Sequence, residues 1–278
     1  MSRLSRPRPI LFLVAAALGG TLGCAEWSGN KSASYSDNAK ETYERGAREL
    51  KNENWLDAIK YFQATRQKFG FSKWATLAEL GMADADFGRE KYTEAIDGYR
   101  SFIKAHPTHE MTQNGYAAFR IGASFHKDIP GEWFLVPPAY EKDQGPVRDA
   151  LRELRGFAQD YPDSPYVKKA RELVEDCIRR LGDHELYVAR FYLDRGKPLA
   201  TVSRLEGLLR DYPGSRLEAE VLLLLGRTFL AMEKPGEARQ TFERLVRSHP
   251  EDFHAGKAQR YIEYIDRRFG AAAVVPPG

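Results

Sequence analysis

A helical pattern that returns every 37 residues is the strongest constraint on how this chain can fold. Ala58 and Phe62 recur 37 residues later as Ala95 and Tyr99. An alanine followed four residues later by an aromatic residue places both side chains on one face of a helix, so a neighbouring helix can approach the small residue while the ring fills the space beside it. The same separation joins three further pairs, which are Thr201 and Ala238, Leu205 and Phe242, and Pro213 and Pro250.

Each of these helices is preceded by a second helical segment that contains a small residue, at Gly46, Ala83, Gly122 and Gly226. Prolines follow the repeats at Pro107, Pro162, Pro213 and Pro250. Because proline cannot continue a helix, it marks the exit from each repeat. Two helices in a unit of this length are typical of the tetratricopeptide repeat, whose usual period is about 34 residues. The sequence therefore predicts an all-α, tetratricopeptide-like solenoid of about five helical hairpins with a C-terminal capping helix.

The expected hairpins can be placed along the chain. They pair 38–52 with 54–68, 73–88 with 91–105, 109–127 with 144–160, a long helix from Pro165 to Asp194 with 197–211, and 216–231 with 235–248. Ser164 and Ser215 are expected to cap helices, Pro165 to take the first helical position, and Gly182 to allow a bend. A helix over 253–268 would cover the last exposed face. Repeats 1–3 would then occupy 38–160, and repeats 4–5 with the cap 161–269.

The N-terminus is typical of an exported lipoprotein. Three arginines precede an apolar run over 10–22, which Gly23 and Cys24 follow. The run is shorter than the roughly 20 residues that a membrane-spanning helix needs. We expect residues 1–23 to be a cleaved signal peptide and Cys24 to carry a diacylglycerol and an N-acyl chain; an ordinary signal peptide is the alternative. Residues 24–37, rich in Ser and Asn, would form a flexible linker, and 270–278 a disordered tail.

Charge argues against a nucleic-acid partner. The chain has 42 Lys plus Arg and 39 Asp plus Glu, but residues 1–23 contain three Arg and no acid, so the remainder has 39 of each. Nucleic-acid binding needs a sustained cationic face. Ala25 after Cys24 follows the sorting pattern of outer-membrane lipoproteins that face the periplasm.

No pattern in the sequence indicates catalysis, a metal site or a cofactor. The six histidines are scattered, and no HExxH, phosphate-binding loop or nucleophile elbow occurs. Cys177 lies at a helical apolar position, so we expect a small buried hydrophobic residue rather than a reactive thiol. The chain is interpreted as a binding protein rather than an enzyme.

A solenoid offers a concave groove, and two sets of residues are candidates for binding. Counting from the repeat template, the positions facing the groove in repeats 1–3 are Tyr43, Leu50, Lys51, Leu80, Phe87, Phe119 and His126. An extended peptide would suit this apolar and aromatic surface; alternatively, the rings pack between helices. The segment 127–143 interrupts the third repeat and carries Trp133 and Phe134, which either fold back onto the solenoid or meet a partner.

Several stretches resemble a known family. They are the seven residues Asp160–Tyr166, the runs over 187–196 and 200–213, and the loop and helix start at Ile129-Pro130, Asp143-Gln144 and Arg148–Leu151. Together with the order of lipobox, linker, five repeats and a long fourth opening helix, they resemble the YfiO (BamD) type of lipoprotein from the outer-membrane β-barrel assembly machinery.

The resemblance implies a location, partners and one interface residue. Family members are anchored on the periplasmic face of the outer membrane, receive unfolded β-barrel clients through the N-terminal repeats, and bind a periplasmic domain of the central assembly subunit through the C-terminal repeats, together with other assembly lipoproteins. Arg204 matches a family position implicated in contact with the central subunit; an ion pair with Glu206 or a neighbouring helix is the alternative. A different periplasmic repeat lipoprotein, such as a cell-wall coordinator or a pilus or secretin pilot protein, is the alternative function, and an envelope hydrolase a third.

Overall fold

The computed structural model describes residues 26–130 and 138–270. Within these ranges the regular structure is entirely helical: α1 (Glu26–Lys51), α2 (Trp55–Lys68), α3 (Lys73–Gly88), α4 (Tyr92–Ala105), α5 (Glu110–Gln113), α6 (Tyr116–Lys127), the 3₁₀-helix η1 (Ala139–Glu141), α7 (Gly145–Asp160), α8 (Val167–Asp194), α9 (Pro198–Asp211), α10 (Glu218–Ala231), α11 (Pro235–Ser248) and α12 (Phe253–Phe269).

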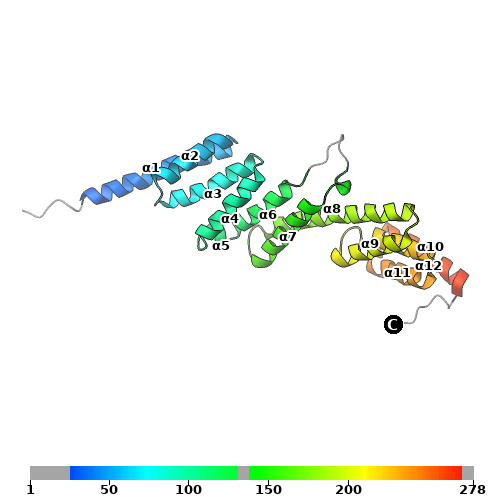
Figure 1. Ribbon diagram of the computed structural model, residues 1–278. Coiled ribbons are helices and arrows are strands. Elements are labelled where there is room, and N and C mark those ends of the chain that lie inside the picture. Colours follow the sequence, from blue (N-terminus) through cyan, green and yellow to red (C-terminus); the bar gives the residue numbers. More distant parts are fainter. Residues whose placement is uncertain (1–25, 131–137, 271–278) are drawn as a thin grey trace, which may run out of the picture.

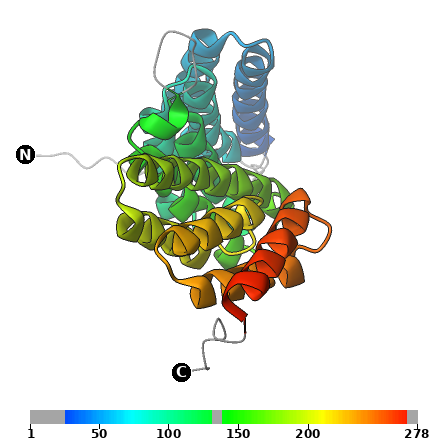
Figure 2. The ribbon, with the colours of Figure 1, turned by 90° about the vertical axis from the view of Figure 1, so that its right-hand side faces the viewer.

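The long helices pack in chain order. Each packs on the next one, from α1 on α2 through to α11 on α12, with α4 contacting α6 across the short α5. First helices of successive hairpins also touch, as α1 touches α3 and α10 touches α12. The result is an elongated array with α1 at one end and α12 at the other (Figure 1), and Figure 2 views it from the α12 end. The predicted α-solenoid of helical hairpins with a C-terminal capping helix is confirmed.

The repeated Ala and aromatic positions form the centre of the hairpins. Ala58, Phe62, Ala238 and Phe242 are completely buried. Gly226 of α10 lies directly against the Phe242 ring, where an added Cβ would come within 2.5 Å of a ring carbon. Gly46 of α1 stands in the same relation to Phe62, at 2.8 Å. A small residue on one helix therefore makes room for the ring of the next helix.

The turn inside a hairpin has a repeated conformation. Glu53, Glu90 and Glu233 have φ values of 62°, 60° and 60°, and Gly196 has 67°. Glu53 and Glu90 are 37 residues apart, as are Gly196 and Glu233. A left-handed residue in the turn reverses the chain over a few residues, although a side chain at that position costs about 1–2 kcal/mol. The 37-residue repeat thus includes the turn as well as the helix faces.

Two of the predicted helix boundaries in the N-terminal half are wrong. Residues 26–37, expected to be a flexible linker, belong to helix α1. The stretch contains no proline, and Tyr35 packs edge-on against the Phe69 ring at 5.1 Å, so tertiary contact outweighs its weak helix propensity. The single helix expected over 109–127 is broken into α5 and α6 by Gly115, whose φ is +80°.

The two predicted serine caps have different outcomes. Helix α8 begins at Val167 rather than Pro165, but the Ser164 hydroxyl accepts a hydrogen bond from the Tyr166 backbone N–H at 3.3 Å, as a capping serine does. The same hydroxyl donates to the Asn114 carbonyl at 2.7 Å, which ties the start of α8 to the break before α6. Helix α10 begins at Glu218, and the Ser215 hydroxyl makes no hydrogen bond with the described residues. Helix α8 runs through Gly182 as one continuous element. Of the tail, only Gly270 is described; residues 1–25 and 271–278 lie outside the described ranges.

Candidate binding surfaces

Three groove candidates in the first hairpin differ in how free they are. The Tyr43 ring lies 5.6 Å from the Phe62 ring and 5.2 Å from Trp74 and is half-buried, which raises the pKa of its hydroxyl. Leu50 is half-buried against the same cluster, whereas Lys51 is exposed. Tyr43 and Leu50 therefore contribute to packing and also present an accessible edge.

The second hairpin places its two candidates differently. Leu80 is only 5% exposed and belongs to the core between α3, α4 and α6, so it does not form part of an open surface. Phe87 is half-buried and is covered by the Arg120 guanidinium, whose carbon lies 3.8 Å from the ring centroid. A cation over an aromatic face is attracted to it and holds the ring in place.

Arg120 belongs to a buried polar network that the sequence analysis missed. Tyr99 and Tyr116 donate hydrogen bonds to one oxygen of Asp84 at 2.6 and 2.7 Å. The Arg120 guanidinium lies 3.3 Å from the same oxygen, and its Nε donates to the Tyr99 hydroxyl at 2.9 Å. Burial raises the pKa of the Asp84 carboxyl, while Arg120 and the two hydroxyls act to lower it. Four side chains from α3, α4 and α6 are thereby joined.

One sequence signal could have revealed this network. The buried aromatic position of the repeat is Phe62 and Phe242 elsewhere, but Tyr99 in the second hairpin. A buried tyrosine hydroxyl needs a hydrogen-bond partner, so Tyr99 predicts a polar side chain close to its hydroxyl. The sequence could not identify Asp84 as that partner, because nothing in its helix distinguishes it from an ordinary solvated acid.

In the third hairpin, both candidate side chains make contacts within the protein. Phe119 stacks on Tyr166 with ring centroids 5.4 Å apart. His126 Nε2 lies 2.9 Å from an oxygen of Asp176 on α8. Burial acts to raise the pKa of Asp176, but hydrogen bonds from Arg180, Arg179 and His126 bring it below its usual range. Both candidates therefore join α6 to α8, whatever else they bind.

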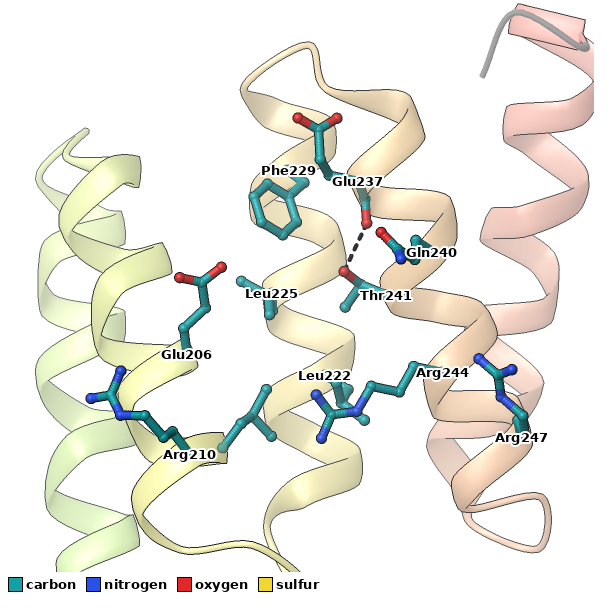
Figure 3. Close-up of a pocket in the computed structure, with 11 residues that line it drawn as sticks. Glu206, Arg210, Leu222, Leu225, Phe229, Glu237, Gln240, Thr241, Arg244 and Arg247 are labelled. Atoms are coloured by element: carbon teal, nitrogen blue, oxygen red, sulfur yellow. Dashed lines mark hydrogen bonds between the residues drawn. The ribbon is translucent and has the colours of Figure 1, made fainter. Parts of the chain in front are cut away.

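A groove on the C-terminal half was not anticipated from the sequence. It measures about 520 Å³ and lies between α9 and α11. Figure 3 shows Glu206 and Arg210 on one wall and Arg244 and Arg247 on the other. Apolar side chains of α10 form the floor, namely Leu222, Leu225 and Phe229. An apolar floor with charged walls of both signs suits an amphipathic segment of another protein.

Arg204 forms an intramolecular ion pair, which was the alternative to a contact with a partner protein. Its guanidinium lies 3.2 Å from Glu185 on α8, and the Arg204 side chain is 46% exposed. The partner is thus a neighbouring helix rather than Glu206. Because the Arg204 side chain is half-exposed, its guanidinium can also reach a carboxylate of a partner, whereas Glu185 is only 19% exposed.

The remaining candidate residues are the lipidation site, two residues of the 127–143 segment and Cys177. Cys24, Trp133 and Phe134 lie outside the described residues. Cys177 is buried between α7 and α8, and burial raises the pKa of its thiol to about 12, as expected for a structural residue. In the described ranges, no three His, Cys, Asp or Glu side chains gather where a metal could bind, and no helix is long and apolar enough to cross a membrane.

Comparison with known proteins gives consistent matches along the chain. The model of the YfiO family, described as an outer membrane lipoprotein, matches residues 35–241, and a tetratricopeptide-repeat model matches residues 223–273. The outer membrane protein assembly factor BamD of Caulobacter vibrioides is 25% identical over 100% of this chain and 95% of its own length. The Haemophilus influenzae protein of the same name is 26% identical over 84% of this chain and 87% of its own. Among solved structures, the TPR2AB-domain:pHSP90-complex of yeast Sti1 matches over 85% of this chain and 95% of its own, with 12% identity and a TM-score of 0.45.

Proposed function

Because this chain belongs to the YfiO family of outer-membrane lipoproteins, we propose that it works as an outer-membrane protein assembly factor that receives unfolded β-barrel clients and attaches to a central assembly subunit. The observation that carries the proposal is the extent of the family match. It runs over residues 35–241, and therefore through the N-terminal repeats and most of the C-terminal repeats. The work is binding rather than bond-making chemistry.

The N-terminal repeats are proposed to receive the client. A β-barrel strand presents alternating apolar residues, and its terminal residue is commonly aromatic. Tyr43 and Phe87 offer half-buried aromatic edges, and exposed Lys51 lies near Leu50 on the same helix. Because most of each ring is already used in packing, little apolar surface remains for the client, which favours weak and reversible holding. Weak holding suits a protein that must release its client to the membrane.

The C-terminal repeats are proposed to bind the central subunit. Arg204 is exposed enough to meet a partner carboxylate. The groove between α9 and α11 supplies apolar area on the same half of the molecule. Acyl chains on Cys24 would keep the array at the membrane, with about 0.8 kcal/mol for each buried CH₂ group.

The general proposal is tested by depleting the protein from growing cells. We expect the levels of outer-membrane β-barrel proteins to fall broadly, measured by quantitative proteomics of isolated outer membranes. Normal barrel levels together with failure of cell-wall coordination or of secretin assembly would overturn the proposal in favour of a different periplasmic repeat lipoprotein.

The partner surface is tested by charge reversal with a matched control. Arg204→Glu should reduce co-purification with the central subunit by about tenfold, because a favourable charge contact becomes repulsive. Arg190→Glu is the control, since Arg190 also forms a half-exposed pair with an acid of another helix, Glu220. Circular dichroism should show unchanged helicity in both variants. Equal loss in both variants, or loss in neither, would remove Arg204 from the interface.

A further inference from the structure

A basic hollow lies at the C-terminal end of the array, away from the surfaces discussed above. It has a volume of about 600 Å³ and is formed between α10 and the capping helix α12. Helix α12 is the last element of the array and lies nearest the viewer in Figure 2. The lining consists of Leu223, Arg227, Lys257, Arg260, Tyr261 and Tyr264. We define these six residues as the basic hollow.

The basic hollow is lined by three cations. Arg227 comes from α10, Lys257 and Arg260 come from α12, and no acid of the described residues lines the hollow. Within residues 26–130 and 138–270, none of these three cations takes part in an ion pair. Two arginines of neighbouring α11 behave differently, since Arg239 pairs with Asp266 and Arg244 with Glu218. Like charges gathered at one hollow repel each other, so a negative ligand would be stabilised there.

The floor of the basic hollow is apolar and rigid. Tyr261 stacks on the buried Phe242 ring, with centroids 4.9 Å apart and planes 6° from parallel. Leu223 is 7% exposed, and Tyr264 is 43% exposed. The Lys257 ammonium lies 4.3 Å from the centre of the Phe253 ring, an attraction that helps to place it. The hollow therefore combines three cations with a surface in which the Tyr261 ring is already held in place before anything binds, which lowers the entropic cost of binding.

From this combination we propose that the basic hollow binds an extended acidic segment of a partner polypeptide, one in which carboxylates alternate with apolar or aromatic residues. In an extended segment, alternate side chains point to opposite sides. Carboxylates on one side would meet Arg227, Lys257 and Arg260, and arginine can hold a carboxylate through two parallel hydrogen bonds. Apolar side chains on the other side would lie on Leu223, Tyr261 and Tyr264. A lipid phosphate would satisfy the cations but would make no use of this floor.

The site is separate from the proposed client surface and from Arg204, and its test needs neither a barrel client nor the central subunit. The probe is a fluorescent extended peptide in which Asp alternates with Phe, titrated with the full lipidated chain in detergent micelles. A second peptide with Lys in place of Asp is titrated in parallel. Vesicles of phosphatidylethanolamine with phosphatidylglycerol are titrated without detergent against the full chain carrying Cys24→Ser, so that no acyl anchor contributes, with and without the test substitutions. Lys257→Glu combined with Arg260→Glu is the test variant.

A matched control variant is available in the same chain. Lys168→Glu combined with Arg171→Glu reverses the same charges at the same three-residue spacing near the start of α8, where neither side chain forms an ion pair with any residue that the structure describes. We expect the acidic peptide to bind the natural chain and the control equally, and to bind the test variant at least about tenfold more weakly, with affinity falling as salt rises. Thermal unfolding followed by circular dichroism should show that both variants are folded.

Three results would overturn the inference. One is equal affinity of the acidic peptide for the natural chain and the test variant. Another is equal affinity for the Lys peptide, which would mean that the basic hollow does not distinguish a negative peptide from a positive one. The third is loss of vesicle binding in the test variant without loss of peptide binding, which would assign the basic hollow to anionic lipid headgroups instead.

Discussion

The two halves of the array are stabilised in different ways. In the C-terminal half, one cluster of 17 buried apolar residues, eight of them leucine, runs from α8 to α12. In the N-terminal half, α1 to α6 are divided between clusters of four and eight buried residues, and half-buried aromatic rings surround them. The polar network of Asp84, Tyr99, Tyr116 and Arg120 lies in that half.

This difference suits different kinds of binding. A continuous apolar core resists local opening, whereas small separate clusters allow one hairpin to open while its neighbours remain folded. A rigid half can hold a permanent partner, and an adaptable half can accept many unfolded clients. The proposed division of labour therefore follows from how the cores are built, and three predictions test the comparison.

The largest expected effect comes from removing the central ring of a hairpin in each half. Phe62→Ala and Phe242→Ala each delete a completely buried ring and should each cost about 3–5 kcal/mol. Hydrogen exchange followed by mass spectrometry should show the consequences in different places. Phe62→Ala should raise exchange in α1–α3 alone, whereas Phe242→Ala should raise it throughout α8–α12. Exchange that rises uniformly along the chain in both variants would contradict the idea of two differently organised halves.

The next effect concerns two arginines whose acidic partners differ in exposure. Arg120→Leu removes the cation from Asp84, whose side chain is only 18% exposed, and should lower the free energy of unfolding by about 3 kcal/mol at neutral pH. Arg239→Leu in the C-terminal half, whose partners Asp266 and Glu243 are 49% and 43% exposed, should cost no more than about 1 kcal/mol. Urea unfolding measures both. The Arg120→Leu deficit should shrink in acid, because protonated Asp84 needs no cation; a deficit independent of pH would disprove the role of the carboxylate.

The smallest effect is the pH dependence of two carboxyl groups. Hydrogen bonds from Arg180, Arg179 and His126 outweigh burial and bring the pKa of Asp176 below 3.8, so the stability that its ionised form contributes is present above pH 3.8 and is lost as the pH falls through the folded-state pKa. Burial raises the pKa of Asp84 above 3.8, so its contribution has the opposite sign and is lost as the pH rises.

Thermal unfolding of Asp176→Asn against pH isolates the first contribution. The variant should be less stable than the natural chain at neutral pH, by about 1–2 kcal/mol, because two arginines and His126 lose their charged partner. The difference should vanish in strong acid. Asp149→Asn is a control, since its pair with Arg152 is exposed; a similar pH response in the control would show that Asp176 has no special role.

The architecture of this protein is encoded locally in its repeat. The 37-residue spacing fixed the number of hairpins, the faces that Ala58, Phe62, Ala238 and Phe242 bury, and most helix limits within a few residues. It did so because helix periodicity and neighbour stacking are local properties that a repeat encodes once for each unit. The same locality made Cys177 recognisable as a buried residue.

Which side chains are free to bind and which are already engaged depends on contacts between helices that are distant in the sequence. Asp84 finds Tyr99 and Tyr116 across three helices, His126 finds Asp176, and Arg204 finds Glu185, over separations of 15 to 50 residues. Helix α1 includes Tyr35, whose ring meets Phe69, a contact that composition does not show. These partner residues come together only when the hairpins stack into a superhelix. No local pattern in a single sequence indicates such contacts.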